Sequence, residues 1–381
     1  MRTKTHVTAV TAAFLTLRQR LAQRLEKKWS RKLVAALLAG ILMAVLAPIG
    51  FAQSSVGYLF FIDSAHGYVQ TGQIDRDGHF SSIVPASPYW AAGISKVVNT
   101  ANGLLAYNAN NGDAQVVQMR PDGIRIYGGH YSFSAGWTHI VSNGDFLFFY
   151  RGTGLGTYFG DGRAAIGYIT PDGQWVQTAS FVPGSFGLWT HIVATDNNLF
   201  FYNNLNGAAA VGYISYNGLF IQTQNFPAGS LSSFSHIVSD GRSLLFYQKQ
   251  TGAGWVGVID APGQLVITQH SVALPAGYSV LVRSDRYLVL HNPNTGGTSI
   301  GYVDRIGYQF RVTDQTTFSA GTTRIVSTKD DLFFYFPPPY NNGYGMVAHI
   351  DRNGKLQVTH GVANLLSPSL SGWDQIAATA R

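Results

Sequence analysis

One pattern of residues returns along most of this chain and restricts what the chain can fold into. It begins with an aromatic residue and a β-branched run, as in Gly136–Val141 (GWTHIV), and continues with an apolar run that ends in tyrosine, Leu147–Tyr150 (LFFY). The apolar run recurs at residues 59, 104, 147, 199, 244, 288 and 332, at intervals of 43 to 52 residues. A repeat of this length is typical of β-propellers and solenoids.

Each repeat divides into four short strands. In the third copy we predict strands over residues 138–142, 146–151, 164–170 and 174–181, because β-branched and aromatic residues fill these segments and turn formers bound them. The last turn carries Asp-Gly or Asn-Gly in five copies, which favours a two-residue hairpin. Four strands joined by short turns predict one antiparallel propeller blade. The chain after residue 56 lacks sustained helical periodicity.

The two ends of the repeat array predict how the ring closes. The array begins at the second part of the pattern, Val56–Ile62, and it ends with a lone first part, Gly372–Thr379. The C-terminal strand can therefore complete the blade that the N-terminal segment leaves unfinished, whereas a solenoid would need capping repeats instead. We predict an all-β, seven-bladed β-propeller of four-stranded antiparallel blades, closed by the C-terminal strand.

Residues 1–52 have the composition of a helical export signal. Nine Lys and Arg residues lie within residues 1–50, an apolar run covers residues 33–46, and Pro48 and Ala52 suggest cleavage before Gln53. An uncleaved anchor over residues 33–52 is the alternative, because a membrane span needs about 20 apolar residues. We therefore predict a propeller domain over residues 53–381 that is secreted or periplasmic, or membrane-anchored if the signal stays.

The chemistry of residues 53–381 argues against several classes of function. Residues 51–381 hold 17 Lys/Arg and 18 Asp/Glu, so no basic footprint for nucleic acid is present. The chain has no Cys, and its one Glu is Glu26 in the leader, so the commonest glycosidase acid/base residue is missing. The Asp residues of the turns, such as Asp77, are explained by turn geometry. We expect no catalytic residue, no metal, no cofactor and no enzyme activity.

Repeated aromatic and histidine residues are the candidates for ligand binding. Rings at the start of the repeats could stack on sugars or could wedge between blades, and repetition at one position favours neither alternative. The histidines two residues later share a strand face with these rings, and a histidine that recurs with the fold is more often a buried hydrogen-bonding residue than a ligand contact. Two longer loops, 151–163 and 336–345, add tyrosines. The candidate ligand-binding residues are Trp137, His139, Trp189, His191, Phe234, His236, Tyr278, Trp373, Tyr158 and Tyr340.

The Gly-Trp start followed by Leu-Phe-Phe resembles the repeat of tachylectin-like β-propeller lectins. It is more similar still to bacterial secreted proteins with Gly-Trp-Thr-His-Ile-Val repeats, and the resemblance covers residues 56–381. It implies binding of N-acetylated or similar sugars in grooves between blades, near Gly136-Trp137 and Gly372-Trp373, although tachylectins have five blades. We expect a carbohydrate-binding protein with several equivalent weak sites, glycans as partners, and no membrane partner after signal cleavage. A protein-interaction scaffold or an Asp-based glycan hydrolase are the alternatives.

Overall fold

The computed structural model describes residues 57–379, apart from 89–91, 121–124, 153–159, 261–262, 329, 339–342, 366 and 368–371. The predicted export signal, residues 1–52, lies outside the described residues, so its helix and the domain boundary at residue 53 stay predictions. Within the described part, no helical segment has the length and hydropathy of a membrane span.

The described residues form seven antiparallel sheets of four strands each. Six blades are continuous in sequence, and the seventh combines the C-terminal strand with the first three strands. The strands, blade by blade, are β4 (Lys96–Thr100), β5 (Gly103–Tyr107), β6 (Asp113–Met119) and β7 (Arg125–Ser132); β8 (His139–Asn143), β9 (Phe146–Tyr150), β10 (Ala164–Ile169) and β11 (Trp175–Phe181); β12 (His191–Ala194), β13 (Leu199–Tyr202), β14 (Ala209–Ile214) and β15 (Phe220–Phe226); β16 (His236–Ser239), β17 (Ser243–Tyr247), β18 (Ala253–Ile259) and β19 (Leu265–Ala273); β20 (Val280–Ser284), β21 (Tyr287–His291), β22 (Gly297–Val303) and β23 (Phe310–Thr317); β24 (Arg324–Ser327), β25 (Asp331–Phe336), β26 (Tyr344–Ile350) and β27 (Leu356–Val362); and finally β28 (Gln375–Thr379), β1 (Gly57–Asp63), β2 (Tyr68–Ile74) and β3 (Phe80–Pro88).

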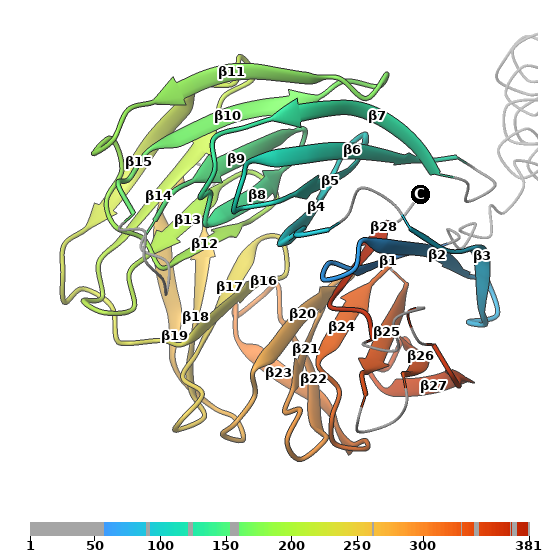
Figure 1. Ribbon diagram of the computed structural model, residues 1–381. Helices are drawn as coiled ribbons and strands as arrows, with labels where there is room; N and C mark the ends of the chain where they lie inside the picture. The colour runs from blue at the N-terminus through green and yellow to red at the C-terminus, as the bar shows by residue number, and fades with distance from the viewer. Residues whose placement is uncertain are drawn as a thin grey trace, which may run out of the picture. The chain divides into compact units, whose positions relative to one another are not determined.

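The blades stand side by side in a closed ring (Figure 1). The first strand of each blade contacts the first strand of the next, from β4 through β24 to β28 and back to β4. Ring closure is made by β28, which pairs antiparallel with β1, with Tyr58 opposite Thr379 and Ile62 opposite Gln375. The structure therefore confirms the all-β fold, the seven blades, the four-stranded antiparallel sheets and the closure by the C-terminal strand.

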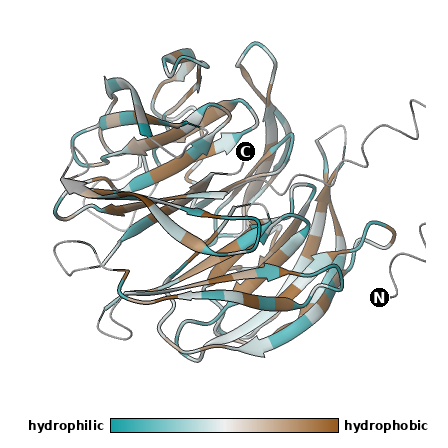
Figure 2. Cartoon of the chain, turned by 90° about the vertical axis from the view of Figure 1, so that its right-hand side faces the viewer, coloured by the Kyte–Doolittle hydropathy of each residue, from teal (hydrophilic) through white to brown (hydrophobic). Residues whose placement is uncertain are grey.

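The second strand of each blade holds the core. In β9, the residues from Leu147 to Tyr150 are at most 1% exposed, because the strand lies between β8 and β10 and both of its faces pack against neighbouring blades. Burial on both faces explains why the Leu-Phe-Phe-Tyr run is continuous rather than alternating. Figure 2 shows the apolar residues concentrated along the strands and the hydrophilic residues in the connecting loops.

The turn between the third and fourth strands differs from the predicted two-residue hairpin. Asp75 N–H donates to His79 O and Gly78 N–H donates to Asp75 O, which leaves three residues in the loop. Only the last of them, Gly78, has a positive φ (77°), and Gly173, Gly218, Gly263 and Gly354 repeat this geometry. The turn is thus a type I turn followed by a left-handed glycine, a common three-residue connection.

Candidate functional site

A tyrosine clasp positions the aromatic residue that starts five of the repeats. The Tyr150 hydroxyl at the end of β9 donates to Gly187 O and accepts the backbone N–H of Trp189 at 2.8 Å. Burial raises the pKa of Tyr150 to about 12, so the hydroxyl keeps its proton. The same pair of bonds is made by the hydroxyls of Tyr107, Tyr202, Tyr247 and Tyr335. The final tyrosine of the repeat therefore ties each of these blades to the next.

The five candidate aromatic residues lie between blades. Trp137, Trp189, Phe234, Tyr278 and Trp373 are between 2% and 9% exposed. Their rings pack on neighbouring rings, for example Trp137 on Phe149 with centroids 5.9 Å apart. Packing is therefore a role that each of them has in this structure. A ligand contact stays a prediction, and Trp137 is the one of the five that borders the groove described below.

The candidate histidines fasten neighbouring first strands. The His139 ring lies between the Thr138 hydroxyl, 2.9 Å from Nδ1, and Thr190 O of the next blade, 3.2 Å from Nε2. His191 repeats this bond to Ser235 O, and burial lowers the pKa of both rings, that of His139 to about 4. His236 has the same position and a pKa that burial also lowers.

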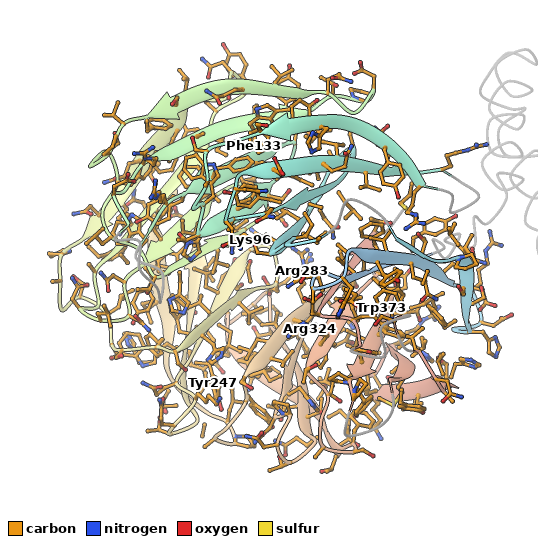
Figure 3. The ribbon with its side chains drawn as sticks, in the orientation of Figure 1. Lys96, Phe133, Tyr247, Arg283, Arg324 and Trp373 are labelled. Carbon is orange, nitrogen blue, oxygen red and sulfur yellow. The ribbon has the colours of Figure 1, made fainter. Side chains whose placement is uncertain are left out.

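The same position on two other first strands carries a longer cation instead of histidine. Arg324 at the start of β24 donates from Nε and Nη2 to Asp374 O of the next blade, and Lys96 starts β4 (Figure 3). The position therefore does not require imidazole chemistry, and at the start of β20 it is filled by Val280.

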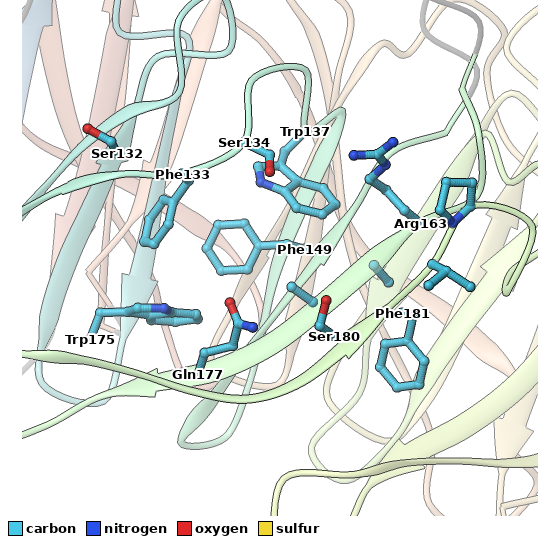
Figure 4. Close-up of a pocket in the computed structure, with 14 residues that line it drawn as sticks. Ser132, Phe133, Ser134, Trp137, Phe149, Arg163, Trp175, Gln177, Ser180 and Phe181 are labelled. Carbon is cyan, nitrogen blue, oxygen red and sulfur yellow. The ribbon is translucent and has the colours of Figure 1, made fainter.

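A groove opens between the β4–β7 blade and the β8–β11 blade (Figure 4). Its volume is about 420 Å³, within the range of about 300–1,000 Å³ that is usual for small-molecule sites. We name it the Ala165 groove, after a residue on its floor. The lining residues are Ser132, Phe133, Ser134, Trp137, Phe149, Arg163, Ala164, Ala165, Trp175, Gln177, Ser180, Phe181, Val182 and Pro183.

Aromatic rings form the floor of the Ala165 groove. Phe133, Phe149 and Trp175 meet edge to face, with centroids 5.2 to 5.3 Å apart. Trp175 can lie across the neighbouring strand β10 because Gly167 has no side chain there; a Cβ at Gly167 would lie 2.4 Å from the indole. Phe133 and Trp175 are half-buried, so part of each ring is accessible.

The groove exists because two small residues face each other on β10 and β11. Ala165 pairs with Phe149 on one side and with Ser180 on the other. In the β16–β19 blade, Trp255 pairs with Phe246 at the place of Ala165, and its indole contacts the His270 ring at 4.9 Å. Trp255 and His270 thus fill a space in the β16–β19 blade. Ala165 and Ser180 leave the corresponding space open in the β8–β11 blade.

The rim of the groove is polar and close to neutral. The guanidinium of Arg163 is held by Asp161, with Nε and Nη2 both 2.7 Å from Oδ2. Gln177, Ser132, Ser134 and Ser180 add exposed amide and hydroxyl groups. Among the described lining residues, none carries a carboxylate or an imidazole. The groove can therefore stack, donate and accept hydrogen bonds, but its described walls supply no general acid or base.

The sequence prediction found one residue of this groove, Trp137. Phe133, Trp175 and Ala165 were missed because they were read as ordinary strand and loop residues. The signal that could have revealed them is the alignment of the repeats, in which Ala165 takes the place of Trp255. The loop tyrosines Tyr158 and Tyr340 lie outside the described residues, so their role stays a prediction.

The propeller is similar to several solved structures. It matches a protein from Lactobacillus plantarum with a TM-score of 0.62 at 12% identity, covering 86% of this chain and 99% of that chain. A candidate 6-phosphogluconolactonase from Bacteroides uniformis matches with a TM-score of 0.62 at 13% identity, over 86% of this chain and 100% of that chain. The periplasmic gluconolactonase of Pseudomonas aeruginosa matches with a TM-score of 0.59 at 15% identity, over 86% and 99%.

These likenesses establish the propeller fold alone. No protein-family model matches the chain. No curated protein matches it. The resemblance to tachylectin-like lectins is therefore supported at the level of the β-propeller, and the specific repeat family is not.

One expectation from the sequence is overturned by these structures. We expected a protein that is not an enzyme, but propellers of the same fold are named as gluconolactonases. The prediction was wrong because it rested on missing contiguous motifs. A propeller gathers the side chains of a site from separate blades, so a catalytic site on it requires no such motif.

Proposed function

We propose that this protein binds a carbohydrate at one principal site, the Ala165 groove. The observation that carries the proposal is the pairing of accessible ring surface on Phe133 and Trp175 with the amide of Gln177 and the hydroxyl of Ser180 (Figure 4). Aromatic rings pack against the C–H face of a pyranose, while amide and hydroxyl groups bond to its hydroxyls. This proposal replaces several equivalent sites by one.

The charge distribution supports a neutral ligand. Arg163 is already paired with Asp161, so an anionic ligand would compete with that carboxylate for the guanidinium. A neutral hydroxyl can instead accept a hydrogen bond from the same guanidinium without breaking the pair, because arginine carries five N–H donors. N-acetylated hexosamines fit these requirements and are the sugars that the tachylectin resemblance implies.

Titration of the full-length protein with N-acetylglucosamine, followed by tryptophan fluorescence, tests the proposal. Gln177→Ala should weaken binding by about 0.5–1.5 kcal/mol, the usual worth of one hydrogen bond. Gln222 holds the same place in the next blade, opposite Gly212 as Gln177 is opposite Gly167, so Gln222→Ala is the matched control. Unchanged binding by Gln177→Ala, or equal losses in both variants, would contradict the assignment of the groove.

Hydrolysis of a sugar lactone is the second candidate function. It is supported by the names of the two gluconolactonase-type neighbours and by one carboxyl group, Asp331 at the start of β25. Burial raises the pKa of Asp331 to about 6, so this group exchanges a proton close to neutral pH, as a general base must. The test measures acid release from glucono-δ-lactone by the wild type and by Asp331→Asn. Release by the wild type that the substitution abolishes would support lactone hydrolysis. Turnover that persists in the variant would exclude Asp331 as the general base.

We further propose that the protein is exported, on the composition of residues 1–52. Sequencing the N-terminus of the mature protein tests this proposal. A start at Gln53 supports a cleaved signal, whereas an intact N-terminus in the membrane fraction supports the anchor over residues 33–52.

A further inference from the structure

The junction that closes the ring shares one hydrogen bond with other junctions and lacks a second one that three of them make. At five junctions, a threonine of one fourth strand donates to a carbonyl in the last turn of the next blade. At the closing junction Thr359 Oγ1 donates to Gly78 O at 3.0 Å, and Thr223 and Thr313 bond in the same way to Gly263 O and Gly354 O. The turn 75–79 is therefore held against β27.

At three of the other junctions, the side chain of the residue after that threonine accepts a backbone N–H from the next blade. Gln224 accepts from Leu265 N at 2.6 Å, Gln269 from Phe310 N at 2.9 Å and Asp314 from Leu356 N at 3.0 Å. At the closing junction this residue is His360, and the structure gives its ring no hydrogen bond among the described residues. Its ring instead meets the ring of His79, edge to face, with centroids 5.2 Å apart.

Two carboxylates lie beside this pair of histidines. Asp75, Asp77 and His79 each place one ligand atom within 4.8 Å of the others, and His79 Nδ1 lies 3.6 Å from Asp75 Oδ1. The N–H groups of Asp77 and His79 both donate to Asp75 Oδ1 at 2.9 Å, which fixes the turn.

We propose that Asp75, Asp77, His79 and His360 form a binding site for a divalent transition metal of the Zn²⁺ type. Imidazole nitrogen and carboxylate oxygen are ligands of four-coordinate zinc, whereas calcium takes oxygen ligands alone. The side chains of Asp75 and His79 are about half exposed, 46% and 55%, so small rotations can bring their ligand atoms together. The sequence explained Asp77 by turn geometry, and the fold adds the two imidazoles.

The site would fasten the two ends of the repeat array to each other. His79 belongs to the first blade segment of the chain, and His360 to β27, the last continuous fourth strand. A metal shared by the two would hold the split blade against its neighbour, in addition to the β1–β28 pairing. The preceding junction is a natural counterexample, since its turn has the same geometry but carries Lys355 and faces Asp314.

Titration of chelator-treated, tag-free full-length protein with ZnCl₂ tests the proposal by calorimetry and by thermal unfolding. The variants are His79→Gln and His360→Gln, because glutamine already stands at these places in other repeats as Gln264 and Gln224. We expect one Zn²⁺ per chain and a higher Tm with the metal in the wild type. We expect each variant to bind at least about tenfold more weakly.

The control is His130→Gln, which changes an exposed histidine on β7 that is remote in sequence from the site. It should bind Zn²⁺ like the wild type. Zinc binding that persists in the His79→Gln/His360→Gln double variant, or wild-type protein that takes up no Zn²⁺, would overturn the proposal. Melting of the metal-free variants at the wild-type temperature shows that a loss of binding reflects the ligands and not the fold.

Discussion

The β8–β11 and β16–β19 blades solve the same packing problem in opposite ways. In the β16–β19 blade, Trp255 covers the space between blades and contacts both Phe234 and His270. In the β8–β11 blade, Ala165 and Ser180 stand at the corresponding places, and the space stays open as a groove of about 420 Å³. The two blades share strand order, but the β18–β19 pairing has a register shift across Trp255 that the β10–β11 pairing lacks at Ala165.

This difference separates the residues that build the ring from those that can give it a function. Residues that recur, such as Tyr150 and the buried second strand, make the same contacts at several junctions. Residues that vary between the repeats, such as Ala165 and Trp255 or the pair His79 and His360, change what one junction can hold. On a repeat scaffold, the positions that vary are therefore the more informative guide to binding sites.

The filled blade should lose the most stability when its large residue is removed. Trp255→Ala deletes an indole that packs on Phe234 and His270, so we expect a loss of about 3–5 kcal/mol in the free energy of unfolding. Denaturant titration measures it. A loss below about 1 kcal/mol would show that Trp255 does not fill its junction, and the comparison with Ala165 would fail.

The clasp shared by the two blades should be costly to remove from either of them. Tyr150→Phe and Tyr247→Phe each leave a buried backbone N–H, that of Trp189 or Tyr278, without its acceptor. We expect each variant to lose about 1–3 kcal/mol of stability. Binding at the Ala165 groove should persist in Tyr247→Phe, and a loss of sugar affinity there would contradict the separation of scaffold from site.

The Ala165 groove of the β8–β11 blade should lose affinity for sugar when an aromatic side chain of its floor is truncated. Trp175→Ala removes an accessible ring surface of the Ala165 groove, and we expect about a tenfold increase in Kd for N-acetylglucosamine, about 1.4 kcal/mol. Leu265 has the same place in the filled blade, opposite Ile259 as Trp175 is opposite Ile169, so Leu265→Ala is the control. Equal affinities of the wild type and Trp175→Ala for N-acetylglucosamine would contradict stacking of the sugar on the Trp175 ring.

The smallest effect at neutral pH should come from the first-strand histidines of the two blades. Burial lowers the pKa of His139 to about 4, from an ordinary value of 6.5. The neutral ring is therefore favoured in the folded state, and its contribution to stability is complete above pH 6.5. As the pH falls from 6.5 towards 4, the unfolded chain binds a proton that the folded chain excludes, so stability decreases.

We expect His139→Gln to make stability depend less on pH in this window while changing little at pH 7. His236, whose pKa burial also lowers, gives the matched variant His236→Gln in the filled blade. Thermal unfolding between pH 4 and pH 7 measures both. A steeper pH dependence in either variant would show that the ring is charged in the folded state.

The architecture could be predicted from the sequence because the same residue pattern recurs in each blade. The constant spacing of the apolar runs predicted the blades, and the lone first part at Gly372–Thr379 predicted the closure. Strand ends in the β8–β11 blade fell within one residue of the prediction. These features depend on local periodicity and turn residues, which a single sequence displays directly.

The candidate sites could not be predicted in the same way, because they depend on what neighbouring blades bring together. Trp137 drew attention as a repeated aromatic residue, but the groove beside it opens through Ala165 and Ser180, which lack any signal of their own. The contact between His79 and His360 joins residues from opposite ends of the chain. Such pairs become visible when the repeats are compared position by position within the folded ring.

The most direct test fills the Ala165 groove with a larger side chain, as Trp255 fills the corresponding space of the β16–β19 blade. In the series Ala165→Leu, Ala165→Phe and Ala165→Trp, the last variant recreates the residue of the β16–β19 blade at a place with about 420 Å³ of space. We predict stepwise loss of N-acetylglucosamine binding with side-chain size, and a Tm at or above that of the wild type. Full binding by a folded Ala165→Trp protein would contradict the claim that this groove is the carbohydrate site.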